Sequence, residues 1–171
     1  LGSGSNNGTS ANMSQASRTF DVPRYSQNSF EFDSSLSQSL DGTTNYTLAE
    51  GRSQMTISAW VDMNNIGNSS LTYLCQVFNS AFSFGVRLQT TTSTILWFYS
   101  GTAGNNARAS ANLGQIKGRG WQHLLICVDL IKPTFTEVQV YLNGVAKNMN
   151  GYLTQTTFNS VSAPPIIGEG T

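Results

Sequence analysis

Alternating apolar and polar residues predict β-strands along most of the chain. The pattern is clearest in residues 121–130, where Leu124, Ile126, Val128 and Leu130 occupy every second position. Successive side chains of a strand point to opposite faces, so these four residues form one wholly apolar face. The residues between them are mostly apolar as well, which is typical of a strand in the middle of a sheet within a two-layer sandwich.

The strand that follows is predicted to have one dry and one wet face. Over residues 138–143, apolar side chains alternate with Gln139, Tyr141 and Asn143. This pattern is typical of an antiparallel strand with one solvated face. Asn143 and Gly144 tolerate positive φ angles, so they predict a tight hairpin turn at the end of the strand.

The rest of the chain predicts further strands and no helix. The predicted strands cover residues 29–33, 46–48, 55–63, 71–78, 82–89, 94–100, 152–158 and 166–167. Residues 101–120 are polar and contain several glycines, which predicts a long loop with at most one strand, near residues 107–113. No window of about ten residues has the apolar spacing of an amphipathic helix. The fold class is therefore all-β, and this many strands favours a two-sheet antiparallel jelly-roll sandwich over a small barrel.

Low charge limits the classes of partner. Only 11% of the residues are charged and the formal net charge is zero, whereas about 25% are charged in typical soluble domains. The sequence has no cluster of Lys and Arg that would attract nucleic acid or anionic lipid, and no apolar run long enough to span a bilayer. We therefore expect no nucleic-acid partner and no membrane insertion.

The first residues are predicted to form an arm outside the folded domain. Residues 1–19 contain almost no large apolar side chains and are rich in Gly, Ser and Asn. Such a segment cannot offset its own ordering entropy, so we expect a flexible arm or linker followed by one domain over residues 20–171. If the arm is ordered, a neighbouring surface must hold it, which favours an assembly with other copies or chains.

The two cysteines do not define a disulfide by their positions. Cys75 and Cys127 lie in different predicted strands, and a disulfide requires Cα atoms closer than about 7 Å. Two buried free thiols are the commoner arrangement, since unpaired cysteine is among the most buried residue types.

Six segments, in order, resemble laminin G-like domains of the concanavalin A-like lectin/glucanase superfamily. They are FEFDSS at 30–35, MTISAWVDM at 55–63, FSFGVRL at 82–88, GWQHLLICVDL at 120–130, VQVYLNGV at 138–145 and PPIIG at 164–168. The Trp-x-His strand followed by Tyr-Leu-Asn-Gly is the most specific part. The resemblance implies a jelly roll that is usually non-catalytic and binds glycans or proteins through its concave face or rim loops. Family members usually continue past the PPIIG segment into a closing strand, so we expect that strand either to lie beyond Thr171 or to be replaced by another segment, such as residues 20–25 or a neighbouring chain.

A hydrolase is disfavoured because one carboxyl group is missing. Glucanases of the superfamily carry Glu-x-Asp-x-x-Glu on one strand, and retaining hydrolysis needs two carboxyl groups about 5–5.5 Å apart. This chain has Glu31 and Asp33 at the first two positions and Leu36 at the third. We expect no catalytic residues, and expect Glu31 and Asp33 to form the polar face of a strand.

Calcium is the one metal that the residues allow. His123 is the only histidine, which excludes a multi-histidine zinc site. Calcium accepts carboxylate and amide oxygens, and some laminin G-like domains bind it at a rim. Asp41, Asp62 and Asn64 are the candidate ligands, although solvated turns are the commoner explanation for oxygen side chains in such loops. No cofactor is otherwise required.

Glycan binding requires an exposed aromatic ring beside amide and hydroxyl groups. Tyr141 shares its strand face with Gln139 and Asn143, and these three residues, together with Trp97, are the candidate ligand-binding residues. Trp60 is a further candidate aromatic. Trp97 shares its face with Ile95 and Tyr99, so packing in the core is the stronger explanation for it.

Two functions remain open, and a third is disfavoured. The first is a non-catalytic recognition or adhesion module that binds glycan or protein within a larger extracellular or virion surface protein. The second is a structural virion protein, such as a capsid decoration, fibre or tail component, that uses the jelly roll for assembly. The third is a glucanase-like hydrolase.

Overall fold

Every regular element in the described part of the chain is a β-strand. The computed structural model describes the backbone of residues 8–11, 18–19, 29–30, 39–42, 46–47, 52–64, 71–78, 82–90, 93–102, 105–153, 162–163 and 165–167, and the side chains of residues 52–64, 74–75, 86–89, 93–98 and 109–153. The two main sheets are antiparallel. The predicted all-β, two-sheet sandwich is confirmed.

The larger of the two main sheets has eight strands. In spatial order they are β1 (Gly8–Ala11), β4 (Ser39–Gly42), β16 (Pro165–Ile167), β7 (Leu71–Phe78), β8 (Phe82–Thr90), β9 (Thr94–Thr102), β10 (Asn105–Gly114) and β14 (Met149–Tyr152). The smaller sheet has four strands, which are β13 (Val145–Lys147), β12 (Val138–Leu142), β11 (Trp121–Asp129) and β6 (Gln54–Asp62). Two short pairs complete the set, β15 (Ser162–Ala163) with β5 (Tyr46–Thr47) and β2 (Arg18–Thr19) with β3 (Ser29–Phe30).

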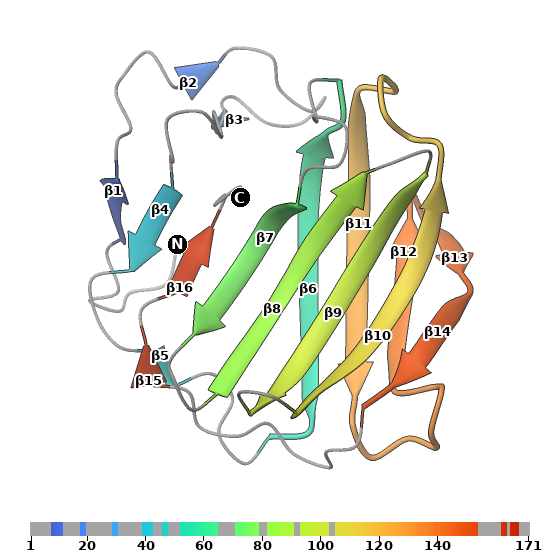
Figure 1. The fold of residues 1–171 in the computed structure, drawn as a ribbon. Helices are drawn as coiled ribbons and strands as arrows, with labels where there is room; N and C mark the ends of the chain where they lie inside the picture. Colours follow the sequence, from blue (N-terminus) through green and yellow to red (C-terminus); the bar gives the residue numbers. More distant parts are fainter. Residues whose placement is uncertain are drawn as a thin grey trace.

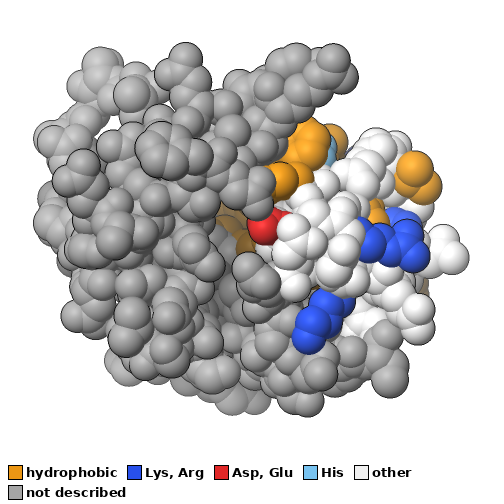
Figure 2. Space-filling view, turned by 90° about the horizontal axis from the view of Figure 1, so that it is seen from above, with side chains coloured by type: hydrophobic (Ala, Val, Ile, Leu, Met, Phe, Trp, Pro, Cys, Tyr) orange, Lys and Arg blue, Asp and Glu red, His pale blue; other side chains and the backbone are white. Residues whose placement is uncertain are grey.

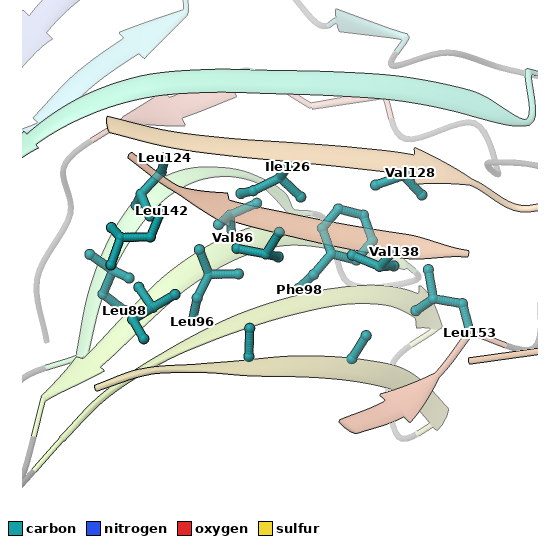
Figure 3. Close-up of a cluster of buried hydrophobic side chains, with 14 of the residues drawn as sticks. Val86, Leu88, Leu96, Phe98, Leu124, Ile126, Val128, Val138, Leu142 and Leu153 are labelled. Atoms are coloured by element: carbon teal, nitrogen blue, oxygen red, sulfur yellow. The ribbon is translucent and has the colours of Figure 1, made fainter. Parts of the chain in front are cut away.

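The two main sheets are stacked, and the hydrophobic core lies between them (Figure 1). Figure 3 shows side chains of β8 and β9, such as Leu88 and Phe98, pointing toward Leu124 and Ile126 of β11. Phe98 and Ile126 are completely buried. Because strand side chains alternate, filling the core with one face of each sheet leaves the opposite face of each sheet directed outward.

The central strand and its hairpin are as predicted. β11 lies between β6 and β12, and its alternate residues are buried on the core side. The chain then turns at Asn143 and Gly144, whose φ angles are 50° and 80°, and continues into β13. An asparagine and a glycine tolerate these angles, which explains why the turn forms at this dipeptide.

Two predicted segments differ from the structure. Residues 105–114 form a full strand, β10, which pairs with β9 along its length, where the sequence predicts mostly loop. Its buried positions include Ala109 and Ala111, and alanine gives a weak hydrophobic signal. Strand β14 covers Met149–Tyr152, a segment not predicted as a strand before Tyr152, whereas most of the strand predicted over 152–158 lies outside the described residues.

The two cysteines are both free. Cys75 belongs to β7 of the larger sheet and Cys127 to β11 of the smaller one. Burial raises the pKa of the Cys75 thiol to about 11, and a hydrogen bond with the Val86 backbone partly opposes this rise. Among the described residues, no helix has the length and apolar character needed to cross a membrane. The division into an arm and a domain, and the fate of the closing strand, stay predictions.

Candidate functional site

The outer face of the four-stranded sheet carries aromatic rings beside uncharged polar groups. We call it the small-sheet face, and its central side chains are Ser58, Trp60, His123, Leu125, Gln139 and Tyr141. Register places them side by side, because His123 pairs with Trp60, and Leu125 pairs with both Ser58 and Tyr141. Directly paired residues of antiparallel strands project on the same side of the sheet. None of the six carries a carboxylate, an ammonium or a guanidinium group.

Trp60 is the most exposed aromatic ring of this face. Half of its surface is accessible to solvent, and its ring centroid lies 5.1 Å from that of His123 in a tilted arrangement. His123 Nε2 shares a 2.9 Å hydrogen bond with the Ser58 hydroxyl. Viewed from above, the molecule shows hydrophobic side chains beside a pale-blue histidine (Figure 2). The hydrogen bond fixes the imidazole ring, and the ring contact in turn restricts the exposed indole.

Tyr141 and Gln139 form a second polar pair on the same face. The Tyr141 hydroxyl donates a 3.2 Å hydrogen bond to Gln139 Oε1. This contact leaves the Gln139 side-chain NH₂ group as a donor, and the tyrosine oxygen keeps its acceptor capacity. The structure therefore brings together two of the residues that the sequence marks as candidate ligands.

Asn143, a third candidate, already uses its side chain within the fold. Its Oδ1 accepts a hydrogen bond from the His123 backbone N–H at 2.8 Å. Its Nδ2 donates to Gln122 Oε1, also at 2.8 Å, and its own N–H donates to the His123 carbonyl. Asn143 thus anchors the hairpin next to His123. Its side-chain amide holds the β11 backbone that carries His123.

Trp97, the fourth candidate, lies on the other sheet. In β9 the core-facing residues are Leu96 and Phe98, both completely buried, so Trp97 points to the outer face of the eight-stranded sheet. Its indole N–H donates a 3.2 Å hydrogen bond to Gln89 Oε1. Core packing is therefore the wrong explanation for Trp97. Both faces of this strand contain apolar residues, so periodicity alone could not decide which face is buried.

The candidate calcium ligands are engaged in local hydrogen bonds where they are described. Asn64 Oδ1 accepts from the Gly120 N–H at 3.0 Å, and Asp62 Oδ1 accepts from the Asn64 N–H at 3.1 Å. Within the part of the chain that the structure describes, no group of three His, Cys, Asp or Glu residues could hold a metal ion. The side chains of Asp41, Glu31 and Asp33 lie outside that part, and the calcium site stays a prediction.

The sequence does not predict the contact between the Trp60 and His123 rings on the small-sheet face. Each lies on the face of its own strand opposite the wholly apolar one, but residues 60 and 123 are far apart in the chain. Only the register between β6 and β11 brings their rings together. Pairing the two most regular strands with their apolar faces on one side would have placed both rings on one outer face, and the register then decides their contact.

Two stacked antiparallel sheets that enclose one hydrophobic core define a jelly-roll β-sandwich. More particularly, residues 38–171 match the sequence profile of laminin G-type domains in the Concanavalin A-like lectin/glucanases superfamily. This match covers most of the chain, so the protein belongs to that superfamily and the resemblance seen in the sequence is confirmed. No curated protein sequence matches the chain significantly.

Solved structures with a similar fold include phage and toxin proteins. The enzymatically active domain of bacteriophage CBA120 tailspike protein 2 aligns with 84% of this chain at a TM-score of 0.55 and 11% identity, over 24% of its own length. Botulinum neurotoxin type C, whose cell entry depends on two ganglioside molecules, aligns with 77% of this chain at a TM-score of 0.54 and 12% identity, over 31% of its length. The binding domain of botulinum neurotoxin DC, solved with SialylT, aligns with 77% of this chain at a TM-score of 0.54 and 12% identity, over 32% of its own length. These similarities show the fold alone, and this chain spans about a quarter to a third of each protein.

Proposed function

We propose that this protein is a non-catalytic recognition module that binds glycan through the small-sheet face, as part of a larger extracellular or virion-surface protein. The observation that carries the proposal is the half-exposed Trp60 ring held beside His123, next to the Tyr141–Gln139 pair. The C–H face of a sugar stacks on an aromatic ring, and its hydroxyl groups need fixed donors and acceptors nearby. The small-sheet face offers both.

The lack of charge at the centre of the face favours neutral sugars. A hydroxyl group exchanges hydrogen bonds with amide, hydroxyl and imidazole groups without the desolvation cost of a charged side chain. The structural neighbours that bind ganglioside or SialylT support a glycan as the class of ligand. Leu36, at the position where glucanases carry the acid/base, supports a role without catalysis.

The second candidate is a structural component of a virion. Its support is the shared fold with a bacteriophage tailspike and the Gly/Ser/Asn-rich start of the chain. This function requires self-association or association with other chains. Light scattering tests it, and a strictly monomeric protein over the accessible concentration range would count against it.

A glycan array tests the leading proposal. The wild-type protein, Trp60→Ala and Phe135→Ala are applied in the presence of Ca²⁺ and again with a chelator. Phe135 is 61% exposed and lies in the turn before β12, whereas Trp60 lies near the other end of the sheet, so Phe135→Ala is a matched control for loss of an exposed aromatic. We expect wild type and the control to bind neutral glycans, and Trp60→Ala to lose at least about tenfold in affinity, since aromatic contacts dominate such sites.

The two ionic conditions separate glycan binding from the predicted calcium site. Binding that survives chelation assigns recognition to the aromatic face alone. Binding that disappears with chelation supports a calcium requirement and brings Asp41, Asp62 and Asn64 back as candidate ligands. No neutral glycan bound under either condition would sink the proposed function.

A further inference from the structure

The eight-stranded sheet carries positive charge without negative charge in its main strands. Between Asp62 and Lys117 the sequence contains only two charged residues, Arg87 and Arg108, and this segment includes β7, β8, β9 and β10. Strand β14 has no charged residue. Partly buried charges in proteins are normally paired with an opposite charge. These strands supply no counter-ion for Arg87.

Arg87 lies on the outer face of this sheet with one donor unused. Its guanidinium carbon is 5.9 Å from the centroid of the Trp97 ring, a cation–π distance. Its Nε atom is closed to solvent and has no hydrogen-bond partner. A buried N–H without an acceptor is unfavourable, so any movement that brings this N–H to an acceptor gains a hydrogen bond without breaking one.

Gln89 fixes the position of the ring under Arg87. The indole nitrogen of Trp97 is only a donor, so the side-chain group of Gln89 that meets it at 3.2 Å must be the carbonyl oxygen. The amide NH₂ of Gln89 is therefore left as a donor beside Arg87, on the same face of β8. Both side chains are half-buried, which holds this arrangement in one place.

A row of polar residues extends across the sheet from Arg87. Arg87 pairs with Trp97, Trp97 with Ser110, and Ser110 with Asn150. Neighbouring strands are about 4.8 Å apart, so the row spans roughly 15 Å over four strands. Ser110 is half-buried and Asn150 is exposed, and their hydroxyl and amide groups match sugar hydroxyls. In Figure 1, no described strand lies over the outer face of β8, β9 and β10. We call Arg87, Gln89, Trp97, Ser110 and Asn150 the large-sheet face.

We propose that the large-sheet face is a second binding site, specific for a glycan that carries a carboxylate, with Arg87 binding the carboxylate. The planar guanidinium donates two parallel hydrogen bonds to a carboxylate, one of them from Nε once a movement of the side chain opens that atom to the ligand. The polar row beyond Arg87 binds the hydroxyl groups of the same glycan. A glycan fits better than an acidic peptide because the other polar members of the large-sheet face, Gln89, Ser110 and Asn150, offer uncharged hydroxyl and amide groups. This site does not depend on sugar binding by the small-sheet face.

Nuclear magnetic resonance detects this binding at the Trp97 indole. The ¹H–¹⁵N spectrum contains three indole signals, one for each tryptophan, and the signal missing in Trp97→Phe belongs to Trp97. The probes are sodium glucuronate, glucose, sodium acetate and a short polyglutamate peptide at matched ionic strength. We expect glucuronate to shift the Trp97 signal saturably, glucose to leave it unchanged, and acetate and the peptide to bind several-fold more weakly than glucuronate.

Variants of Arg87 test the roles of the charge and the planar geometry of its guanidinium group. In Arg87→Gln, which removes the charge, we expect the Kd for glucuronate to rise about tenfold or more, since charge-assisted hydrogen bonds are the strong ones. Arg87→Lys keeps the charge and loses the bidentate geometry, so we expect a rise of roughly threefold or more. Arg119→Gln makes the same charge change at an exposed turn residue and should change Kd less than twofold. A dispersed spectrum confirms that each variant is folded.

Three results would overturn the proposal. They are no saturable shift with glucuronate, a Kd that changes less than twofold in Arg87→Gln, and acetate or polyglutamate binding as tightly as glucuronate, which would indicate a general anion or acidic-peptide site. Failure of the small-sheet proposal is distinguishable, because Trp60→Ala should lose the neutral glycan and keep the glucuronate response.

Discussion

The two outer faces of the sandwich share one core and differ in their chemistry. The small-sheet face presents Trp60, His123, Tyr141 and Gln139 without a charged group at its centre, and its polar atoms bond to one another. The large-sheet face presents Arg87 over Trp97, with one arginine donor unpaired. Uncharged groups that keep free donors and acceptors suit a neutral ligand, whereas an unpaired cationic donor suits an anion.

The difference between the faces arises from the alternation within each strand. In both sheets one set of side chains fills the common core, so that set must be apolar and closely packed. The alternate set is free of this requirement. Evolution can therefore give the two outer faces different ligands without changing the core, as long as each substitution stays on the outer set.

The largest expected effect comes from the core that both faces share. Ile126→Ala removes a completely buried side chain and should lower the free energy of unfolding by about 2–5 kcal/mol. Urea denaturation followed by the fluorescence of all tryptophans measures it. Trp60 and Trp97 report on different sheets. Since both sheets share one core, we expect one common transition, and two separate transitions would show that the sheets do not unfold as one cooperative unit.

Asn143 should affect the small-sheet face alone. Asn143→Ala loses the hydrogen bonds to His123 and Gln122 and places alanine at a φ of 50°, which together should cost about 2 kcal/mol of unfolding free energy. Asn143→Gly keeps the tolerated φ and should cost about half of that. The indole signals should move for Trp60 and stay for Trp97. If both variants lose the same unfolding free energy, the positive φ at residue 143 does not contribute to the cost of the alanine variant.

Alkaline pH should weaken the larger sheet through Cys75. Burial raises the thiol pKa from 9.0 to about 11 in the folded state, so the folded protein holds this proton over a range where the unfolded chain releases it. Stability is therefore fully present below about pH 9 and falls toward pH 11, by on the order of 2 kcal/mol. Stability curves of wild type and Cys75→Ala against pH measure the difference, in which other titrating groups cancel. If the unfolding free energies of wild type and Cys75→Ala change in parallel over this pH range, Cys75 is not the group that destabilises the folded protein at alkaline pH.

The smallest effect is expected for the Tyr141 hydroxyl. Tyr141→Phe removes its hydrogen bond to Gln139 on a solvated face, which should change stability by less than about 0.5 kcal/mol. Affinity for a neutral glycan should nevertheless fall several-fold, because the hydroxyl is one of the polar groups of that face. Glucuronate binding should be unaffected. A stability loss without an affinity loss would mean that the pair is structural.

The sequence predicts what depends on local pattern. β11, β12 and the turn at Asn143 and Gly144 follow from alternation and from residues that tolerate positive φ. For β10 the sequence predicts at most one strand, near residues 107–113, because alanines occupy two of its buried positions, and the full strand is supported by its pairing with β9. Local pattern is thus sufficient for strands with large apolar residues and insufficient for strands that pairing stabilises.

The candidate site required information that alternation does not contain. Tyr141 and Gln139 lie two positions apart on one strand, so their contact follows from the sequence. The contact between Trp60 and His123, and the row from Arg87 to Asn150, depend on strand order and register across the sheets. Asn143 shows the converse: it lies in the turn after β12 and not within the strand, and the hairpin consumes its side chain.

Strand β6, which carries Trp60, has a neighbour on one side only among the described strands of its sheet. The bonds from Leu130 to Ser53 and from Met63 to Gly120 show that odd-numbered residues turn their backbone groups toward β11. In an antiparallel ladder the even-numbered residues, Trp60 among them, then direct theirs to the other side. A strand added along this border would lie directly beside the indole. The breadth of the small-sheet face is thus set by whatever borders β6, so the size of ligand it accommodates can change without any substitution in the face itself.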